Sequence, residues 1–270
     1  MPANSDFPNL SMYRRERSSL LCLLLAMGTI GIWPACWGAE RTEVFDIGHL
    51  GGDMKAVGAR THASRAAGKD KSHEGMFRSG TAFFVTQSGE MLTSAHVVRG
   101  CERINVWPRD MTSIPASLVA IDEQLDVALL ATNRAVKTAA RPLAISVHQG
   151  MSVYTIGFGL TPSSPLVPVM TRGYVHGTAQ PKGHRLLVLR AALHEGNSGG
   201  PVVDAQGALL GMIVGRYTNN PELSVAVRAQ DLARFLDARP GAPTPPILQA
   251  PEMKPGARLR QISALVQCLE

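Results

Sequence analysis

The hydrophobic positions of this chain fall into short runs separated by turn residues. From Ser79 onward, apolar stretches alternate with markers such as Gln87-Ser88-Gly89 and Ala205-Gln206-Gly207. Short apolar runs bounded by turn signals are typical of β-strands. The pattern predicts an all-β fold with two sets of strands: 81–85, 91–94, 104–107, 117–121 and 127–130, then 152–156, 166–174, 186–190, 201–203, 209–214 and 223–227.

Two stretches near the end of the chain show helical rather than strand spacing. Residues 230–238 place Leu232, Phe235 and Leu236 on one face, which predicts a short helix. Residues 239–256 are rich in proline and predict an extended linker. Apolar residues then recur at helical spacing, so we expect an amphipathic helix over 257–270. This helix either docks on the body of the protein or serves as a tail that binds a partner or a membrane.

The first 38 residues have the pattern of a secretory signal peptide. Arg14, Arg15 and Arg17 precede the apolar run Leu20–Trp33, and small residues follow, so we expect cleavage after Gly38. The alternative is an uncleaved anchor, since an apolar run of about 20 residues can span a bilayer. Residues 39–78 would then form an N-terminal segment and loop. We therefore expect an exported, periplasmic protein, or one anchored in the inner membrane and facing the periplasm.

Charge and cysteine content narrow the choice of function. The formal charge is +6, but the basic residues are scattered without interleaved aromatics, so we expect no nucleic-acid partner. No paired Cys/His spacing suggests zinc, and we expect no metal or organic cofactor. After loss of the signal peptide only Cys101 and Cys268 remain. In an oxidising compartment they either pair, which would tie the end of the chain to the first set of strands, or stay as two thiols.

The residues with the strongest chemical signal surround Ser198. A serine hydroxyl needs a neighbouring base, an orienting acid and donors for the developing oxyanion. The turn Gly196-Asn197-Ser198-Gly199-Gly200-Pro201 can aim backbone N–H groups at one spot, because its glycines allow a tight turn. Upstream, His96 offers a base and Asp126 an acid, with Asp122 as the rival acid four residues earlier. The order His, Asp, Ser is that of chymotrypsin-type enzymes.

These motifs resemble those of the trypsin-like serine peptidases of the HtrA/Deg type. The resemblance covers about residues 76–238 and rests on 79–85, 92–98, 126–130 and 196–201. It implies two packed six-stranded antiparallel β-barrels, at 79–140 and 141–238. It also implies that His96 is the general base, Asp126 its orienting acid and Ser198 the nucleophile, with an oxyanion hole in the backbone of Gly196, Asn197 and Ser198. Asp126 is preferred to Asp122 because the family acid directly precedes the apolar strand.

The resemblance also implies a pocket for the side chain before the scissile bond. By position, its lining would come from Ala192, Leu193, Met212, Ile213, Val214 and Gly215. None of these is a carboxylate, so we expect small or medium aliphatic side chains rather than Lys or Arg to fit. Only about 32 residues follow Ala238, so we expect no PDZ domain in this chain.

The function expected from the sequence is therefore that of an exported serine endopeptidase acting on proteins or peptides, unfolded ones in particular. Two alternatives stay open: a catalytically silent peptide-binding protein of the same fold, and a membrane-tethered regulatory factor. A membrane partner is expected only if the N-terminal segment remains uncleaved.

Overall fold

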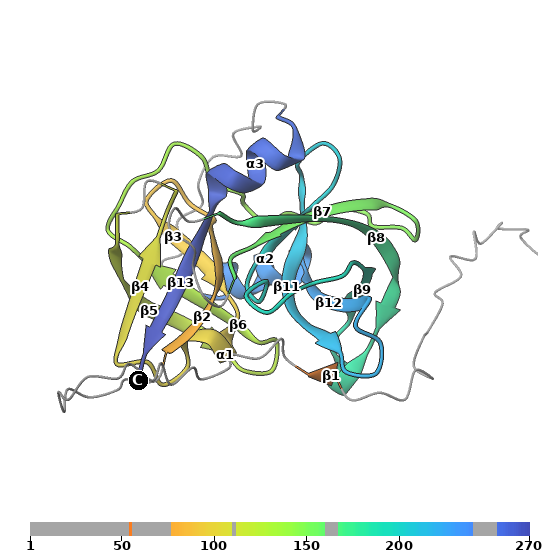
Figure 1. Ribbon diagram of the computed structural model, residues 1–270, viewed down its shortest axis with the longest axis horizontal. Helices are drawn as coiled ribbons and strands as arrows, with labels where there is room; N and C mark the ends of the chain where they lie inside the picture. The colour runs from red at the N-terminus through yellow and green to blue at the C-terminus, as the bar shows by residue number, and fades with distance from the viewer. Residues whose placement is uncertain (1–53, 56–76, 110–111, 160–166, 240–252) are drawn as a thin grey trace, which may run out of the picture. The chain divides into compact units, whose positions relative to one another are not determined.

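The computed structural model describes residues 54–55, 77–109, 112–159, 167–239 and 253–270 (Figure 1). These all lie in the compact unit Glu43–Glu270. The expected signal peptide, most of the segment 39–78 and the centre of the proline-rich linker lie outside the described residues. No helix in the described ranges is long and apolar enough to cross a membrane.

The first barrel is closed by six antiparallel strands, one of which comes from the far end of the chain. Around the barrel the order is β13-β2-β3-β6-β5-β4. Its interior contains Ala82, Phe84, Val106, Leu130 and Val266, all nearly or fully inaccessible to solvent. The strands are β2 (Phe77–Phe84), β3 (Glu90–Thr93), β4 (Arg103–Trp107), β5 (Ile114–Asp122), β6 (Val127–Ala131) and β13 (Ser263–Leu269).

The second barrel is built from consecutive strands. Its order is β11-β10-β7-β8-β9-β12, and pairing of β11 with β12 closes it. The short strand β1 (Met54–Lys55) adds to β11 at Arg216 and Tyr217. The strands are β7 (Ser152–Gly157), β8 (Val169–Ala179), β9 (Leu186–Arg190), β10 (Pro201–Val203), β11 (Leu209–Tyr217) and β12 (Leu223–Arg228), with a 3₁₀ turn at Pro181–Gly183. The prediction of an all-β fold with two six-stranded barrels is confirmed.

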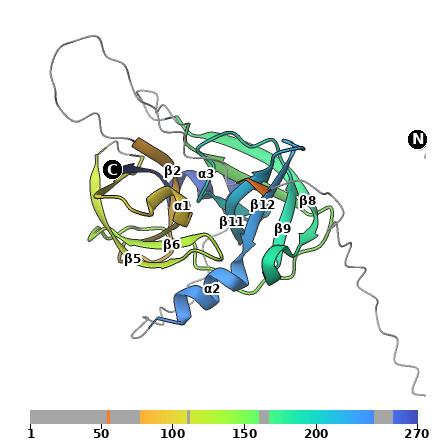
Figure 2. The ribbon, with the colours of Figure 1, turned by 90° about the horizontal axis from the view of Figure 1, so that it is seen from below.

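Three helices accompany the barrels. The single turn α1 (Ala95–Val98) follows β3, and α2 (Ala229–Asp237) lies beside β11 and β12 (Figure 2). The apolar face expected for α2 packs inward, with Leu232 fully buried. The third helix, α3 (Pro255–Ile262), is tied to the segment between the barrels by Arg258, whose Nη2 donates to the Ala139 carbonyl at 2.7 Å. Burial lowers the pKa of the Arg258 guanidinium.

The prediction of one helix over 257–270 is wrong. The helix ends at Ile262, and Ser263–Leu269 forms β13 between β2 and β4. Apolar residues at 265, 266 and 269 fit a helix face, but they also fit a strand that is buried on both sides. Without β13, β2 and β4 would expose unpaired edges, so barrel closure overrides the local pattern. Leu265 and Val266 are buried, which also removes the alternative of a free binding tail.

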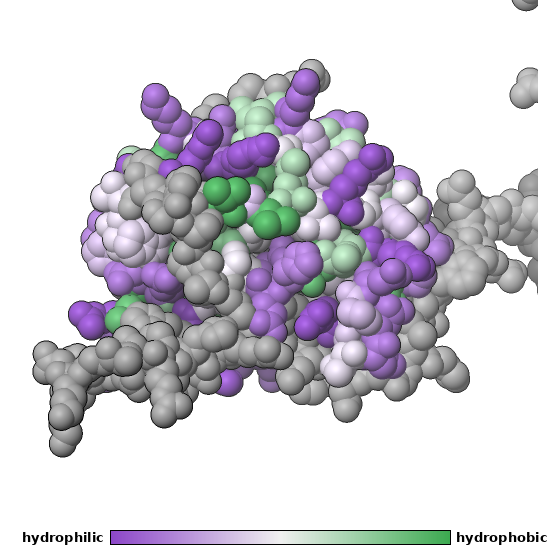
Figure 3. Space-filling model, in the orientation of Figure 1, coloured by the Kyte–Doolittle hydropathy of each residue, from purple (hydrophilic) through white to green (hydrophobic). Residues whose placement is uncertain are grey.

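The surface mixes polar and apolar side chains. On the face in Figure 3 hydrophilic residues predominate, with a small hydrophobic group near its upper centre. Among the described residues, the large hydrophobic side chains that remain exposed lie mainly on β5 and around the start of β8. Most apolar side chains are thus used inside the barrels, where they hold the loops that carry the candidate site.

Candidate active site

His96 sits on the single helical turn α1, directly after the buried strand β3. The start of the turn is anchored, since Ala95 N donates to the Asp126 carbonyl at 3.1 Å, and the turn itself is closed by Arg99 N, which donates to the Ala95 carbonyl at 2.9 Å. The His96 side chain is only 15% exposed. This short, packed turn fixes the direction in which the imidazole leaves the backbone.

Asp126 holds His96 through two hydrogen bonds. Its Oδ2 lies 2.6 Å from His96 Nδ1, and its Oδ1 accepts from His96 N at 2.8 Å. An ionised carboxylate can only accept, so Nδ1 carries a proton and Nε2 is the acceptor of the neutral ring. Asp126 also has φ 57°, a left-handed conformation that costs about 1–2 kcal/mol outside glycine. The strained backbone turns both its carbonyl and its carboxylate toward α1.

The rival acid has a different position. Asp122 Oδ1 accepts from Gln124 N at 2.9 Å and Leu125 N at 3.0 Å, which closes the turn between β5 and β6. Such a side-chain cap is the ordinary use of aspartate in a turn. The structure therefore brings Asp126, and not Asp122, against the histidine.

The Ser198 loop consists of two consecutive tight turns. Asn197 N donates to the His194 carbonyl at 3.2 Å, and Gly200 N donates to the Asn197 carbonyl at 2.8 Å. Gly196 and Gly199 have φ of 96° and 80°, and a Cβ on Gly196 would lie 1.7 Å from the Phe158 carbonyl oxygen. Glycine is therefore required for both its conformation and its lack of a side chain.

Contacts between the barrels bring this loop to the histidine turn. Thr81 N donates to the Ser198 carbonyl at 2.8 Å, and Thr81 Oγ1 donates to the Gly196 carbonyl at 2.6 Å. A Cβ on Gly80 would lie 2.9 Å from both the Ser198 carbonyl and the Val97 side chain. The backbone of Gly80 is therefore packed between the Ser198 loop and the turn that carries His96. His96 Nε2 is buried and, within the described part of the chain, has no hydrogen-bond partner. A ring nitrogen of this kind can take a proton from a hydroxyl.

The buried side chain of Asn197 stabilises the Ser198 loop. Its Oδ1 accepts from His194 N at 3.0 Å, and the residue is 3% exposed. Its own N–H is used in the turn to His194. Of the three residues expected to form the oxyanion hole, Gly196 and Ser198 are thus the candidates for donors, while Asn197 shapes the turn that presents them.

The six residues expected to line the specificity pocket do not share one face. Ala192 is exposed, whereas Leu193 and Ile213 pack together in the core of the second barrel. Met212 and Val214 lie in a different hydrophobic cluster. Side chains alternate along a strand, so neighbours on β11 point in opposite directions.

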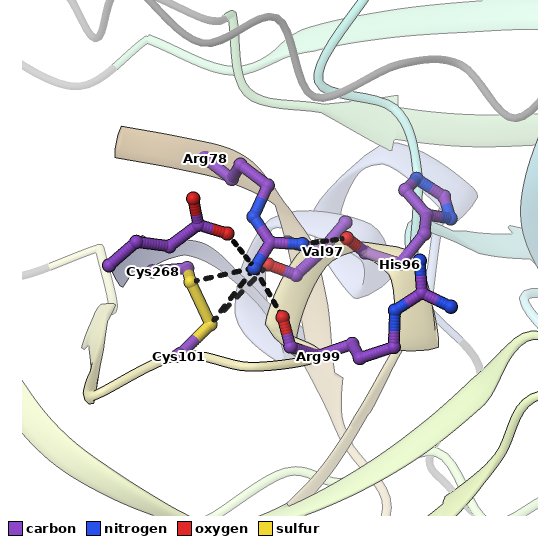
Figure 4. The surroundings of a disulfide bond; sticks show 7 residues. Arg78, His96, Val97, Arg99, Cys101 and Cys268 are labelled. Carbon is purple, nitrogen blue, oxygen red and sulfur yellow. Dashed lines mark hydrogen bonds and ion pairs between the residues drawn. A yellow bond between two sulfur atoms is a disulfide. The ribbon is translucent and has the colours of Figure 1, made fainter. Parts of the chain in front are cut away.

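Sequence reasoning missed two residues of the site. Thr81 bridges the loops and also accepts from Phe158 N at 3.2 Å. Arg78 donates to the His96 carbonyl at 2.8 Å and lies beside a disulfide between Cys101 and Cys268 (Figure 4). The segment 79–85 gave a signal for the neighbourhood of Thr81, but no local pattern marks Arg78, because its partners come from distant parts of the chain.

Comparison with known proteins identifies similar domains in peptidases. Residues 80–212 match the family model described as trypsin-like peptidase domain. Over 148 residues the chain is 31% identical to protease Do-like 1, chloroplastic, of Arabidopsis thaliana, covering 52% of this chain and 34% of that protein. It is 28% identical over 169 residues to serine protease Rv3671c of Mycobacterium tuberculosis, covering 60% of this chain and 42% of that protein. The crystal structure of the active form of Rv3671c superposes with a TM-score of 0.54 at 25% identity, covering 62% of this chain and 75% of the other.

Fold, loop geometry and these similarities together define a chymotrypsin-like serine peptidase domain. More narrowly, it is a trypsin-like peptidase domain whose relatives are serine proteases of the HtrA/Do type. The chain spans less than half the length of the curated relatives named above.

Proposed function

We propose that this chain is an exported serine endopeptidase that hydrolyses peptide bonds by acyl transfer. His96 deprotonates the Ser198 hydroxyl and later protonates the leaving amine, while Asp126 holds the imidazole tautomer and stabilises the imidazolium. The N–H groups of Gly196 and Ser198 bind the oxyanion. Loss of one such donor typically lowers turnover by about 10²–10³-fold.

The single observation that carries this proposal is the His96–Asp126 pair. The 2.6 Å contact at Nδ1, with a second bond from His96 N to the same carboxylate, fixes both tautomer and ring direction. A structural histidine does not need this double attachment, nor a strained backbone at the residue that supplies it. The bonds of Thr81 to the Ser198 loop, and the closeness of Gly80 to both the Ser198 carbonyl and the Val97 side chain, support Ser198 as the nucleophile for this base.

The substrate side chain before the scissile bond should be small or aliphatic. Ala192 is exposed just before the serine loop and offers only a methyl group. Discrimination among aliphatic side chains is weak, about 1–3 kcal/mol per methylene, so cleavage should follow several such residues. The disulfide supports export, because such bonds persist mainly in oxidising compartments.

Digestion of casein by the wild type and by Ser198→Ala tests the reaction. We expect proteolysis by the wild type only, with the cleaved bonds, mapped by mass spectrometry, lying after small or aliphatic residues. Equal digestion by both proteins would remove the nucleophile assignment. No digestion by either, with retained binding of unfolded peptides, would favour a silent peptide-binding protein. Cleavage after Lys or Arg would contradict the pocket assignment alone.

A further inference from the structure

We propose that Arg78 is a positioning residue for His96, and that strand β13 with Glu270 holds Arg78 in place. This inference rests on the proposed function, because it concerns the proposed general base. It makes a stretch of chain more than 160 residues from His96 part of what sets the geometry of the reaction.

Arg78 binds the end of the histidine turn. Its Nη1 donates to the His96 carbonyl at 2.8 Å, and its Nη2 donates to the Arg99 carbonyl. The last carbonyls of a helix have no partner within it, and α1 has only four residues. The planar guanidinium supplies two N–H donors in fixed geometry, one for the His96 carbonyl and one for the Arg99 carbonyl.

His96 is consequently held at both ends of its backbone unit. Asp126 accepts from His96 N on one side, and Arg78 donates to the His96 carbonyl on the other. Rotation of the turn about its axis must break one of these bonds. Since a misplacement of about 1 Å can lower a rate by about 10²-fold, a support that blocks this rotation affects turnover directly.

Strand β13 and Glu270, the residue after it, hold the Arg78 guanidinium on the side away from α1. Arg78 on β2 stands opposite Cys268 on β13, and its Nη2 forms an ion pair with Glu270. The same Nη2 lies 3.5 Å from Cys268 Sγ and 3.9 Å from Cys101 Sγ, so the disulfide packs against it (Figure 4). The Arg78 side chain is only 11% exposed, and a charge this buried is stable only when paired.

The disulfide and the strand also fix the segment that follows α1. Cys101 follows the turn by three residues, and its bond to Cys268 joins the segment after α1 to β13. Glu102 N donates to the Leu269 carbonyl at 2.9 Å, which adds a backbone link at the same place. Arg78 therefore connects two rigid bodies: the closing strand of the barrel and the turn that carries the imidazole.

The test compares Arg78→Gln, Arg78→Lys and Glu270→Gln with the matched control Arg234→Gln. Arg234 also pairs with an acidic side chain, but it lies on α2 and is 74% exposed. With a peptide substrate we expect kcat to fall about 10–100-fold in Arg78→Gln, with KM within about twofold. Arg78→Lys should keep part of the rate, Glu270→Gln should lose less than Arg78→Gln, and Arg234→Gln should match the wild type.

A second measurement separates positioning from general support and from failure of the proposed function. In a Ser198→Ala background, the His96 Nδ1 proton resonance and the pH titration of the ring are followed by NMR, which requires no activity. We expect Arg78→Gln to broaden or shift the Nδ1 resonance, Arg78→Lys to do so less, and Arg234→Gln to leave it unchanged. If Arg78→Gln does not fold, the Lys and Glu270→Gln variants decide.

An inactive wild type with a normal response of the Nδ1 resonance would overturn the proposed function but keep the positioning role. An active wild type whose Arg78→Gln and Glu270→Gln variants match Arg234→Gln in kcat and in the NMR signal would overturn the positioning role alone. A rise in KM with unchanged kcat would do the same.

Discussion

The two barrels supply the candidate site in different ways. The second barrel closes through six consecutive strands, and its site loop is shaped locally by glycines and by the turn of Asn197 onto His194. The first barrel closes only when β13 returns from the far end of the chain, and its histidine turn is fixed by Asp126, Arg78 and a disulfide. The nucleophile loop therefore takes its shape from local turns and is joined to the first barrel by Thr81, whereas the base is held by long-range contacts within the first barrel.

The largest effect should come from the acid of the first barrel. Asp126→Asn replaces one of the two acceptor oxygens by an amide NH2, which can donate to Nδ1 and favour the wrong imidazole tautomer, so we expect kcat to fall by about 10³–10⁴-fold. Asp122→Asn keeps a side-chain oxygen that can accept from the same Gln124 and Leu125 N–H groups, so its kcat should stay within about twofold of the wild type. Steady-state kinetics of both variants on one peptide checks this contrast. A similar loss in both would mean that the turn as a whole, rather than the carboxylate at Nδ1, matters.

The local geometry of the second barrel is tested at Gly196. In Gly196→Ala the new Cβ would meet the Phe158 carbonyl, so the loop must move, and we expect peptide hydrolysis to fall at least about 100-fold. Gly183→Ala is the matched control, since φ is 84° there and no atom lies within 4 Å of the new Cβ. That control should lose only about 1 kcal/mol of stability and keep its activity. Full activity in Gly196→Ala would contradict the description of the loop.

This contrast explains what could be predicted from sequence. The strands of the second barrel follow one another, so their pattern predicts the barrel, and Gly196 to Pro201 forms a contiguous motif. Asp126 was separable from Asp122 because the strand that follows it is visible as an apolar run. The pattern at 263–269 predicts a helix, because its apolar spacing fits both a helix and a strand. Only the pairing with β2 and β4, which the local sequence does not show, makes this segment a strand. Arg78 could not be found, because every partner that defines its role is distant in sequence.

The long-range closure of the first barrel is tested by removing the disulfide. Cys101→Ser with Cys268→Ser opens a link across a sequence separation of 167, and we expect a loss of about 2–4 kcal/mol in the free energy of unfolding. Guanidinium denaturation of variant and wild type measures this loss. Reduction of the wild type should reproduce it, and should leave the double variant unchanged. Equal stability of variant and wild type under oxidising conditions would show that β13 is held by its strand pairing alone.

The smallest effect should come from Thr81, which joins the first barrel to the Ser198 loop. Thr81→Val leaves the Gly196 carbonyl and Phe158 N without a buried partner, which typically costs about 1–3 kcal/mol. Thr132→Val is the matched control, because Thr132 Oγ1 is also buried and donates to a carbonyl, that of Gly89, within the first barrel and away from Ser198. Both variants should lose stability in thermal denaturation, but only Thr81→Val should also lower kcat. Because Thr81 belongs to β2 and its acceptor to the serine loop, a loss of kcat confined to this variant would place the weak point of the site at the junction of the barrels. An equal kcat in the two variants would mean that each loop keeps its shape without the other.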